Sequence, residues 1–246
     1  MVKKHGPPAH LESQPWLAEG EAKRHLVQGM FDQIAPTYDR LNHLLTFNKD
    51  HAWRKKAVEL AEVKPGETVL DLCCGTGDFL PQIRRATGLS GRILGMDFSL
   101  PMLSIAPQKD PQATLAQADA MQIPLQSEAV DVVTVGWGIR NVPDIDQAHR
   151  EIFRVLKRGG RFVSVDMAQP KSAFIGAMSR LVFRRGVPLI GALFGQAKAY
   201  KYLPESTQRF YSREDLIASM QRAGFGSTRF VDLFFGNICI HSGVKS

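Results

Sequence analysis

The stretch Val69-Leu70-Asp71-Leu72-Cys73-Cys74-Gly75-Thr76-Gly77-Asp78 decides the fold of this chain. Its apolar run 69–72 is typical of a short buried strand, and a helical stretch follows from Phe79. The glycines between them, Gly75 and Gly77, let the backbone of a strand-to-helix turn come close to a ligand. The pattern therefore predicts a strand, a glycine turn and a helix, the opening unit of an α/β sheet.

A carboxylate stands where this kind of fold binds a nucleoside. A second apolar run, 92–96, ends in Asp97, twenty residues after Gly77. A carboxylate about 20 residues beyond a glycine turn is where a Rossmann-type sheet binds ribose hydroxyls. A Gly-x-Gly turn alone can be no more than a tight turn, but together with Asp97 it indicates a nucleoside site.

The glycine turn lacks the dinucleotide fingerprint Gly-x-Gly-x-x-Gly, because Leu80 stands at the third glycine. The charge of Asp78 at the start of the helix would oppose a pyrophosphate, so it favours a cationic ligand without phosphate. Residues 71–77 resemble the nucleotide loop of class I S-adenosylmethionine methyltransferases, commonly D-x-G-x-G-T-G, with Cys73 at the first glycine. This resemblance implies S-adenosyl-L-methionine as the cofactor.

Length and composition indicate one large globular domain. The 246 residues are 44% hydrophobic and 22% charged, and their formal net charge is +7. A basic balance suits nucleic acid or an anionic membrane surface, but the basic residues are scattered, which favours ordinary solvated faces. Three cysteines form neither a disulfide framework nor a metal motif, and no apolar run is long enough for a signal peptide or membrane span. We therefore expect a cytoplasmic protein without a metal.

Strand and helix patterns alternate along residues 63–246 and predict a mostly parallel sheet with right-handed crossovers. Strands are expected at 67–72, 92–97, 113–118, 130–136 and 161–167, and helices at 78–86, from 99, at 144–156 and at 212–223. Basic and glycine residues at 157–160 are expected to end the third of these helices. Residues 227–244 are expected to add an antiparallel hairpin, the methyltransferase variant of the Rossmann sheet.

Three segments stand outside this alternation. Residues 1–20, with three prolines, are expected to form a flexible tail. Residues 21–62 are expected to form an N-terminal helical lid over the cofactor site, with plain packing against the sheet as the alternative. Residues 171–210 are expected to be an apolar substrate-side insertion, because an insertion there overhangs the carboxyl ends of the strands, where ligands bind. The alternative is a helical hairpin at a sheet edge, and Pro188 should interrupt any single helix.

Four motifs in the sequence resemble those of one protein family. Residues 38–53 match Y-D-x-M-N-x-x-[LIVM]-S-x-x-x-H-x-x-W, with Leu41, Thr46 and Asp50 at the methionine, serine and histidine positions. Residues 154–160 match R-V-[LIVM]-K-P-G-G with Arg158 for proline, and Asp166 and Ala168 replace the glutamate and serine that follow in the family. Residues 138–142 match G-[LI]-R-N-V and residues 200–206 match Y-x-Y-L-x-E-S. Together they resemble the ubiquinone/menaquinone biosynthesis C-methyltransferases, from about Met30 to the C-terminus.

The resemblance implies a set of cofactor-binding residues. They are Asp71, Gly75, Thr76 and Gly77 around the methionine part, Asp97 on the ribose hydroxyls, and Asp119 and Ala120 at the adenine. The family often has a serine that contacts the cofactor at the position of Gly136, and this contact is missing here. Structural alternatives stay open, such as a helix cap for Thr76 and a surface turn for Asp119.

Catalysis is assigned to Arg140 and Tyr38. A quinol ring becomes a carbon nucleophile when a hydroxyl loses its proton, so the site must stabilise an oxyanion. Arg140 stays cationic and suits that task, with a bound water as the base. Tyr38 would hydrogen-bond the ring or close the lid. The alternatives are an ion pair of Arg140 with Asp144 or Asp146, and a core role for Tyr38.

The resemblance implies an S-adenosylmethionine-dependent C-methyltransferase that acts on a prenylated quinol, demethylmenaquinol first, with a phytyl naphthoquinol or a polyprenyl benzoquinol as alternatives. Because the tail of such a substrate is a lipid, we expect transient contact with the inner face of the membrane. An RNA methyltransferase is disfavoured by the apolar segment 171–195, so no nucleic-acid partner is expected. A non-catalytic cofactor-binding module is disfavoured by Arg140 and Tyr38. The oligomeric state, including a homodimer, stays open.

Overall fold

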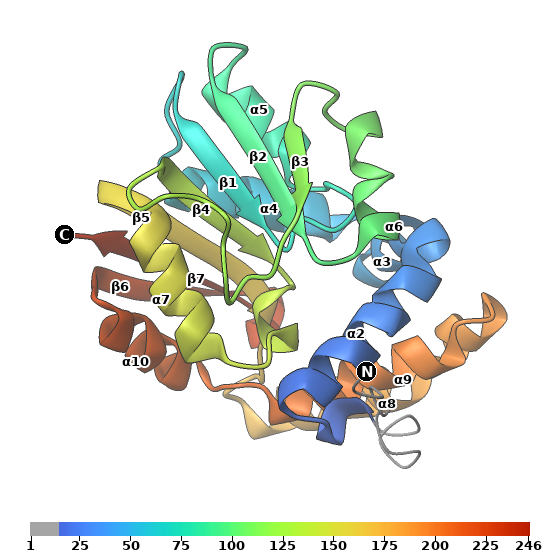
Figure 1. The fold of residues 1–246 in the computed structure, drawn as a ribbon. Coiled ribbons are helices and arrows are strands. Elements are labelled where there is room, and N and C mark those ends of the chain that lie inside the picture. The colour runs from blue at the N-terminus through green and yellow to red at the C-terminus, as the bar shows by residue number, and fades with distance from the viewer. Residues whose placement is uncertain (1–14) are drawn as a thin grey trace, which may run out of the picture.

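The computed structural model describes residues 15–246, without the side chains of residues 15, 193, 197 and 198. Its seven strands form one sheet in the order β3-β2-β1-β4-β5-β7-β6 (Figure 1). The strands are β1 (Thr68–Leu72), β2 (Arg92–Asp97), β3 (Thr114–Gln117), β4 (Val130–Gly136), β5 (Leu156–Met167), β6 (Phe225–Leu233) and β7 (Ile238–Lys245). Pairing is parallel from β3 to β5, and β7 runs antiparallel to both β5 and β6. The predicted fold class is confirmed.

Helices cover both faces of the sheet and make two buried cores. On one face, α4 (Lys49–Leu60) and α5 (Leu80–Thr87) bury Trp53 and Ile83 against β1, β4 and β5. On the other face, α7 (Ile145–Val155) and α10 (Arg213–Ala223) bury Ile152 and Met220. The short helix α6 (Leu100–Leu103) follows β2, and the Ser99 side chain caps it by accepting a hydrogen bond from the Met102 N–H.

Four further helices gather at one end of the sheet (Figure 1). They are α2 (Gly20–Ile34), α3 (Tyr38–Thr46), α8 (Ala173–Leu193) and α9 (Ala197–Arg209). Leu41, Val187 and Tyr200 from three of them share one buried cluster, so the segments before and after the sheet pack together. Residues 1–14 of the expected tail lie outside the described residues, while Pro15–Leu17 forms a 3₁₀ turn and Ala18 is buried.

Two local predictions are wrong. Pro188 does not interrupt the insertion, because α8 continues through it to Leu193. Packing of the neighbouring Val187 in its cluster outweighs the loss of one helical hydrogen bond. The helix α7 does end at Val155, but residues 157–160 do not cap it. They lie in β5, which begins at Leu156, and Lys157 is paired there with Asp131 of β4 at 2.8 Å.

Candidate active site

The turn after β1 has a backbone that glycine adopts easily. Gly77 has a φ of +85°, and an added β-carbon would lie 2.8 Å from Leu80 and 3.0 Å from Ala106, so only glycine fits. A β-carbon at Gly75 would meet nothing within 4 Å, so this part of the turn faces open space. Cys73 has a φ of +56°, which explains why related loops commonly carry glycine at its position.

Asp97 closes the end of β2 with a buried carboxylate. Its two oxygens accept hydrogen bonds from the backbone N–H groups of Gly75, at 2.8 Å, and Ser99, at 2.9 Å. Burial raises the pKa of Asp97 to about 6. A carboxylate has about four acceptor sites, so two remain for the hydroxyls of a ribose. The side chain therefore fits the role predicted for it.

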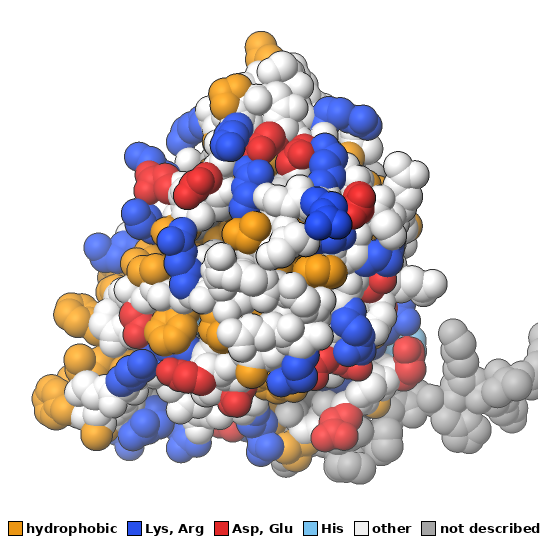
Figure 2. Space-filling view, turned by 90° about the vertical axis from the view of Figure 1, so that its left-hand side faces the viewer, with side chains coloured by type: hydrophobic (Ala, Val, Ile, Leu, Met, Phe, Trp, Pro, Cys, Tyr) orange, Lys and Arg blue, Asp and Glu red, His pale blue; other side chains and the backbone are white. Residues whose placement is uncertain are grey.

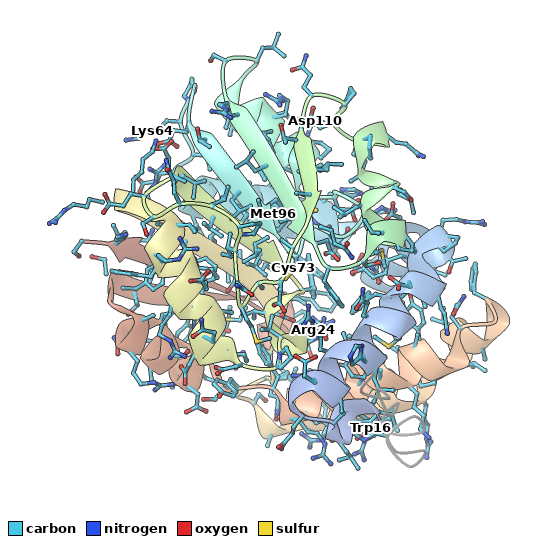
Figure 3. All side chains as sticks on the ribbon, viewed as in Figure 1. Trp16, Arg24, Lys64, Cys73, Met96 and Asp110 are labelled. Atoms are coloured by element: carbon cyan, nitrogen blue, oxygen red, sulfur yellow. The ribbon has the colours of Figure 1, made fainter. Side chains whose placement is uncertain are left out.

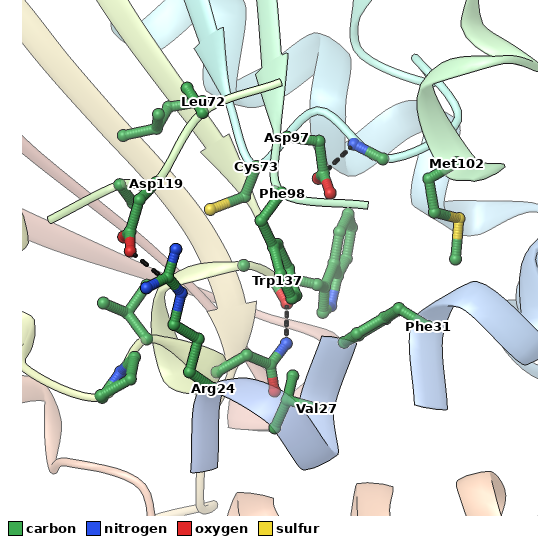
Figure 4. A pocket seen from close by; sticks show the side chains of 18 of the residues that line it. Arg24, Val27, Phe31, Leu72, Cys73, Asp97, Phe98, Met102, Asp119 and Trp137 are labelled. Atoms are coloured by element: carbon green, nitrogen blue, oxygen red, sulfur yellow. Dashed lines mark hydrogen bonds and ion pairs between the residues drawn. The ribbon is translucent and has the colours of Figure 1, made fainter. Parts of the chain in front are cut away.

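A cavity opens beside Asp97, with an empty volume of about 730 Å³ that includes the open space at its mouth. We call it the cofactor cavity; it is lined by Gly75, Asp97, Phe98, Met102, Asp119, Ala120 and Gly136, among others. Figures 3 and 4 show Cys73 at the end of β1 and Arg24 of α2 facing this space. Of the seven predicted cofactor residues, Gly75, Asp97, Asp119 and Ala120 are thus brought together. The open turn and the carboxylate fit a nucleoside cofactor such as S-adenosylmethionine.

The other three predicted cofactor residues do not line this cavity. Asp71 lies inside the sheet, where it accepts a 2.7 Å hydrogen bond from the Thr134 hydroxyl. Its second oxygen is buried without a partner among residues 15–246, and burial raises the pKa of Asp71 to about 7. Gly77 shapes the turn, and Thr76 points into a polar network with α3. Cofactor contacts by these residues stay predictions.

A network of charges joins the turn to α3. The Thr76 hydroxyl donates to the carboxylate of Asp39, and Lys109 Nζ lies 2.7 Å from Asp39, 2.9 Å from Thr76 and 2.5 Å from Asp78. Arg54 of α4 lies 3.2 Å from the other oxygen of Asp78. Burial alone would raise the pKa of Asp78, but Arg54 and Lys109 outweigh it and hold the pKa below its ordinary value.

Two consequences follow from this network. Asp78 is compensated by two cations and is not among the residues that line the cofactor cavity, so its charge contributes little to the choice of ligand there. Asp50, which stands at the histidine of the family signature, is ion-paired with Arg54 and also binds Thr46 and His43. Ligand atoms of His43, Asp50 and His51 lie within 4.8 Å of one another, but Asp50 is already occupied by Arg54.

A second, larger cavity lies under α8 and α9, with an empty volume of about 1420 Å³ that includes the open space at its mouth, and we call it the apolar cavity. Its walls include Val187 of α8 and Leu203 of α9, together with Trp53 of α4. Phe31, Tyr38 and Trp137 line both this cavity and the cofactor cavity. The two cavities therefore meet at three aromatic side chains.

Arg140 lies on the turn after β4 and lines the apolar cavity. Its guanidinium is ion-paired with Asp166 of β5, whereas Asp146 is bound to Ser219 and Arg222. Burial raises the pKa of Asp166, although the charge of Arg140 opposes this. The Arg140 Nε is buried without a hydrogen-bond partner among residues 15–246. The alternative of an ion pair with Asp144 or Asp146 is thus not formed, and the guanidinium is held by Asp166 instead.

Tyr38 contributes a neutral phenol where the cavities meet. Burial raises its pKa, so the hydroxyl stays protonated at neutral pH and acts as a hydrogen-bond donor. The Tyr202 hydroxyl donates to Asn141 at 3.1 Å, beside Arg140. His149 and His241 lie outside both cavities, and burial lowers the pKa of each to about 4.

Several lining residues were not found from the sequence. Phe98 follows Asp97 directly, so its position after the strand was a usable signal. Arg24 reaches from α2 to Asp119 at 3.3 Å, a contact across 95 residues that no local pattern indicates (Figure 4). Gly136 packs under Phe79, whose ring would lie 2.7 Å from an added β-carbon. The Phe79 ring thus fills the space that a serine would need.

Comparison with known proteins identifies the family of this chain. The profile of the ubiE/COQ5 methyltransferase family matches residues 19–245. A demethylmenaquinone methyltransferase of Desulfitobacterium hafniense is 41% identical over 95% of this chain and 96% of its own. One of Lactiplantibacillus plantarum is 40% identical over 90% of this chain and 96% of its own. These matches run along nearly the whole length of the relatives.

Solved structures share the fold. A SAM-dependent methyltransferase of Thermotoga maritima superposes with a TM-score of 0.65 at 21% identity, over 89% of this chain and 99% of its own. One of Aquifex aeolicus has a TM-score of 0.58 at 19% identity, over 78% and 89%. The matched length and identity leave one conclusion: the chain belongs to the ubiE/COQ5 methyltransferase family, and its class of enzyme and its cofactor, S-adenosylmethionine, are as predicted.

Proposed function

We propose that the protein methylates a ring carbon of a prenylated quinol, converting demethylmenaquinol to menaquinol. The observation that carries this proposal is the meeting of two cavities at Phe31, Tyr38 and Trp137. One cavity has the carboxylate and open turn of a nucleoside site, and the other is large and mostly apolar. A methyl donor in the first and a lipid ring in the second would have their reacting atoms at the shared wall.

The apolar cavity suits a long hydrocarbon tail. Its side chains include Phe183, Val187 and Leu203, which offer no partner for phosphate or for base edges. A polar RNA acceptor is therefore disfavoured. Demethylmenaquinol is chosen over a phytyl naphthoquinol or a polyprenyl benzoquinol because both relatives described above are demethylmenaquinone methyltransferases.

Residues of this chain supply the polar part of the chemistry. S-adenosylmethionine, when bound, provides an electrophilic methyl group on a positively charged sulfur. Arg140, which lines the apolar cavity, offers the N–H groups that Asp166 leaves free to the oxygen of the quinol that becomes negative as its proton leaves. Arginine does not accept that proton, so a water beside Arg140 takes it and passes it to solvent. After the methyl group has moved from sulfur to the ring carbon, that carbon loses its hydrogen as a proton to the phenolate oxygen or to water, which restores the quinol. Asp166 fixes the guanidinium, and Tyr38 donates a hydrogen bond to the ring.

The place of the reaction follows from the substrate. None of the helices described within residues 15–246 is long and apolar enough to cross a membrane. We place the enzyme in the cytoplasm. Because the quinol tail is a membrane lipid, the enzyme meets its substrate transiently at the inner face of the membrane. A homodimer is compatible with this arrangement, and sedimentation velocity of the purified protein decides it.

An assay with mixed acceptors tests the proposal. The protein is incubated with methyl-labelled S-adenosylmethionine, reduced membranes from a quinone-deficient strain, and total RNA. Label in a prenylated quinol supports the proposal. Label in RNA, or no label in any acceptor despite measured cofactor binding, contradicts it.

A further inference from the structure

The outer face of α8 carries an apolar stripe that no other described element covers. Phe174, Met178, Leu181 and Leu189 recur at helical spacing with Arg185 among them, and the stripe is exposed, from 50% at Leu181 to 77% at Phe174. The opposite face of the helix packs Val187 against Leu41 and Tyr200. An exposed apolar stripe on a helix fixed by its other side indicates a surface that binds something.

The charge on α8 has one sign. The helix contains Arg180, Arg184 and Arg185 and no acidic residue. Arg184 contacts Gln208 at 2.9 Å, while Arg185 has no ion-pair partner among the side chains that the structure describes and is exposed within the stripe. Cations among large apolar side chains match a surface that is anionic at its edge and apolar just beneath, which is the make-up of an anionic bilayer.

The apolar cavity opens beside this stripe. Leu44, Phe47, Val182 and Phe234 line the cavity and are also exposed, up to 77% at Phe47, and Val182 lies on α8 itself. Figure 2 shows hydrophobic side chains gathered at the lower left edge of the molecule, at the height at which α8 lies in Figure 1, with Lys and Arg side chains nearby. The stripe and the mouth of the cavity therefore form one continuous surface.

We propose that α8 is a docking helix that lies on an anionic bilayer, with Phe174, Met178, Leu181 and Leu189 among the acyl chains and Arg185 at the headgroups. Docked this way, the mouth at Phe47 and Val182 faces the lipid, so a prenyl tail enters the cavity without crossing water. The entry route rests on the proposed function, whereas the docking itself does not.

Vesicle binding tests the docking helix on the full chain. The wild-type protein should co-sediment with vesicles of phosphatidylglycerol and phosphatidylcholine, less with phosphatidylcholine alone, and less at high salt. Replacing Phe174, Met178 and Leu181 together by Gln keeps good helix formers on exposed positions that do not line the cavity. The affinity of this triple variant for anionic vesicles should fall by a factor on the order of ten or more. Arg185→Gln should lose most of the preference for the anionic lipid.

Leu89→Gln is the matched control, because Leu89 is 80% exposed in the turn between α5 and β2, away from α8. It should bind vesicles as the wild type does. The proposal is overturned if the wild type does not bind, if the triple variant binds equally well, or if the stripe instead holds a second copy. In that last case, sedimentation velocity shows a wild-type dimer that the triple variant turns into a monomer.

A second readout separates this proposal from the proposed function. The triple variant should methylate a short-chain, water-soluble quinol at the wild-type rate and a long-chain quinol in vesicles more slowly. An equal loss of methylation rate on both substrates contradicts the docking role of α8. If no quinol is methylated by any form of the protein, the proposed function fails, and vesicle binding without quinol still decides whether α8 docks.

Discussion

The guanidinium of Arg140, on the turn after β4, is ion-paired with the buried carboxylate of Asp166 near the end of β5. A second contact, from the Arg140 backbone N–H to Asp166, fixes the same pair. A cation held this way keeps one orientation, as the proposed stabilisation of a quinol oxyanion requires. Asp166 is therefore a positioning residue for the proposed chemistry.

Asp166→Asn should lower turnover by about tenfold or more, because a neutral amide holds the guanidinium less firmly. Affinity for S-adenosylmethionine, measured by calorimetry, should stay near that of the wild type, since neither residue lines the cofactor cavity. Arg140→Ala should lower turnover further, by on the order of 10²-fold. Turnover by Asp166→Asn equal to that of the wild type would remove the pair from the mechanism.

Asp97→Ala should abolish cofactor binding in isothermal calorimetry. The substitution removes the acceptor for the ribose and also the partner of the Gly75 N–H, so the turn loses its support. Asp119→Ala is the comparison, because Asp119 lines the same cavity but is already paired with Arg24. It should weaken binding by a smaller factor. Unchanged affinity in Asp97→Ala would refute the site.

Asp71→Asn should make stability less dependent on pH. In the wild type, burial raises the pKa of Asp71 from the ordinary 3.8 to about 7. Between these values the folded protein holds a proton that the unfolded chain has released, so stability falls as pH rises from about 4 to about 7. The amide of the Asp71→Asn variant does not titrate, so this variant does not lose stability over that pH range.

Urea denaturation at pH 5 and pH 8 measures the effect of this substitution. The free energy of unfolding of Asp71→Asn, relative to the wild type, should rise by at least about 1 kcal/mol between the two pH values. Asp97 titrates in both proteins, so most of its contribution cancels, and what remains is its charge interaction with Asp71, which adds to the raised pKa of Asp71. A relative stability that is flat or falls with pH would show that Asp71 is ionised in the folded state throughout.

Gly136→Ala should destabilise the fold by about 1–3 kcal/mol, because the new β-carbon would overlap the buried Phe79 ring. Gly29→Ala is the matched control in α2, where an added β-carbon meets nothing within 4 Å. It should stabilise by up to about 1 kcal/mol through helix propensity. Thermal unfolding compares the two variants, and equal stability would show that Phe79 moves aside freely.

Local patterns were enough to predict the strands, the hairpin and Asp97, since each depends on residues near in sequence. Strand β2 (Arg92–Asp97) and strand β4 (Val130–Gly136) lie where hydrophobic runs place them. The contact between Asp39 and Thr76 spans 37 residues and that between Arg24 and Asp119 spans 95. Such contacts depend on how α2 and α3 dock, which no local spacing encodes. The predicted break at Pro188 was wrong because tertiary packing of α8 outweighed the low helix propensity of proline.

We claim that a methyl group passes from S-adenosylmethionine in the cofactor cavity to a ring carbon of the quinol in the apolar cavity. Mass spectrometry of purified demethylmenaquinol, incubated with the protein and S-adenosylmethionine carrying a trideuterated methyl group, tests this most directly. We predict that the quinol gains one trideuterated methyl group on its ring, and that the oxidised quinone, which has no hydroxyl to ionise, gains none. Label on oxygen instead of carbon, or no label on the quinol from a protein that binds the cofactor, would contradict the claim.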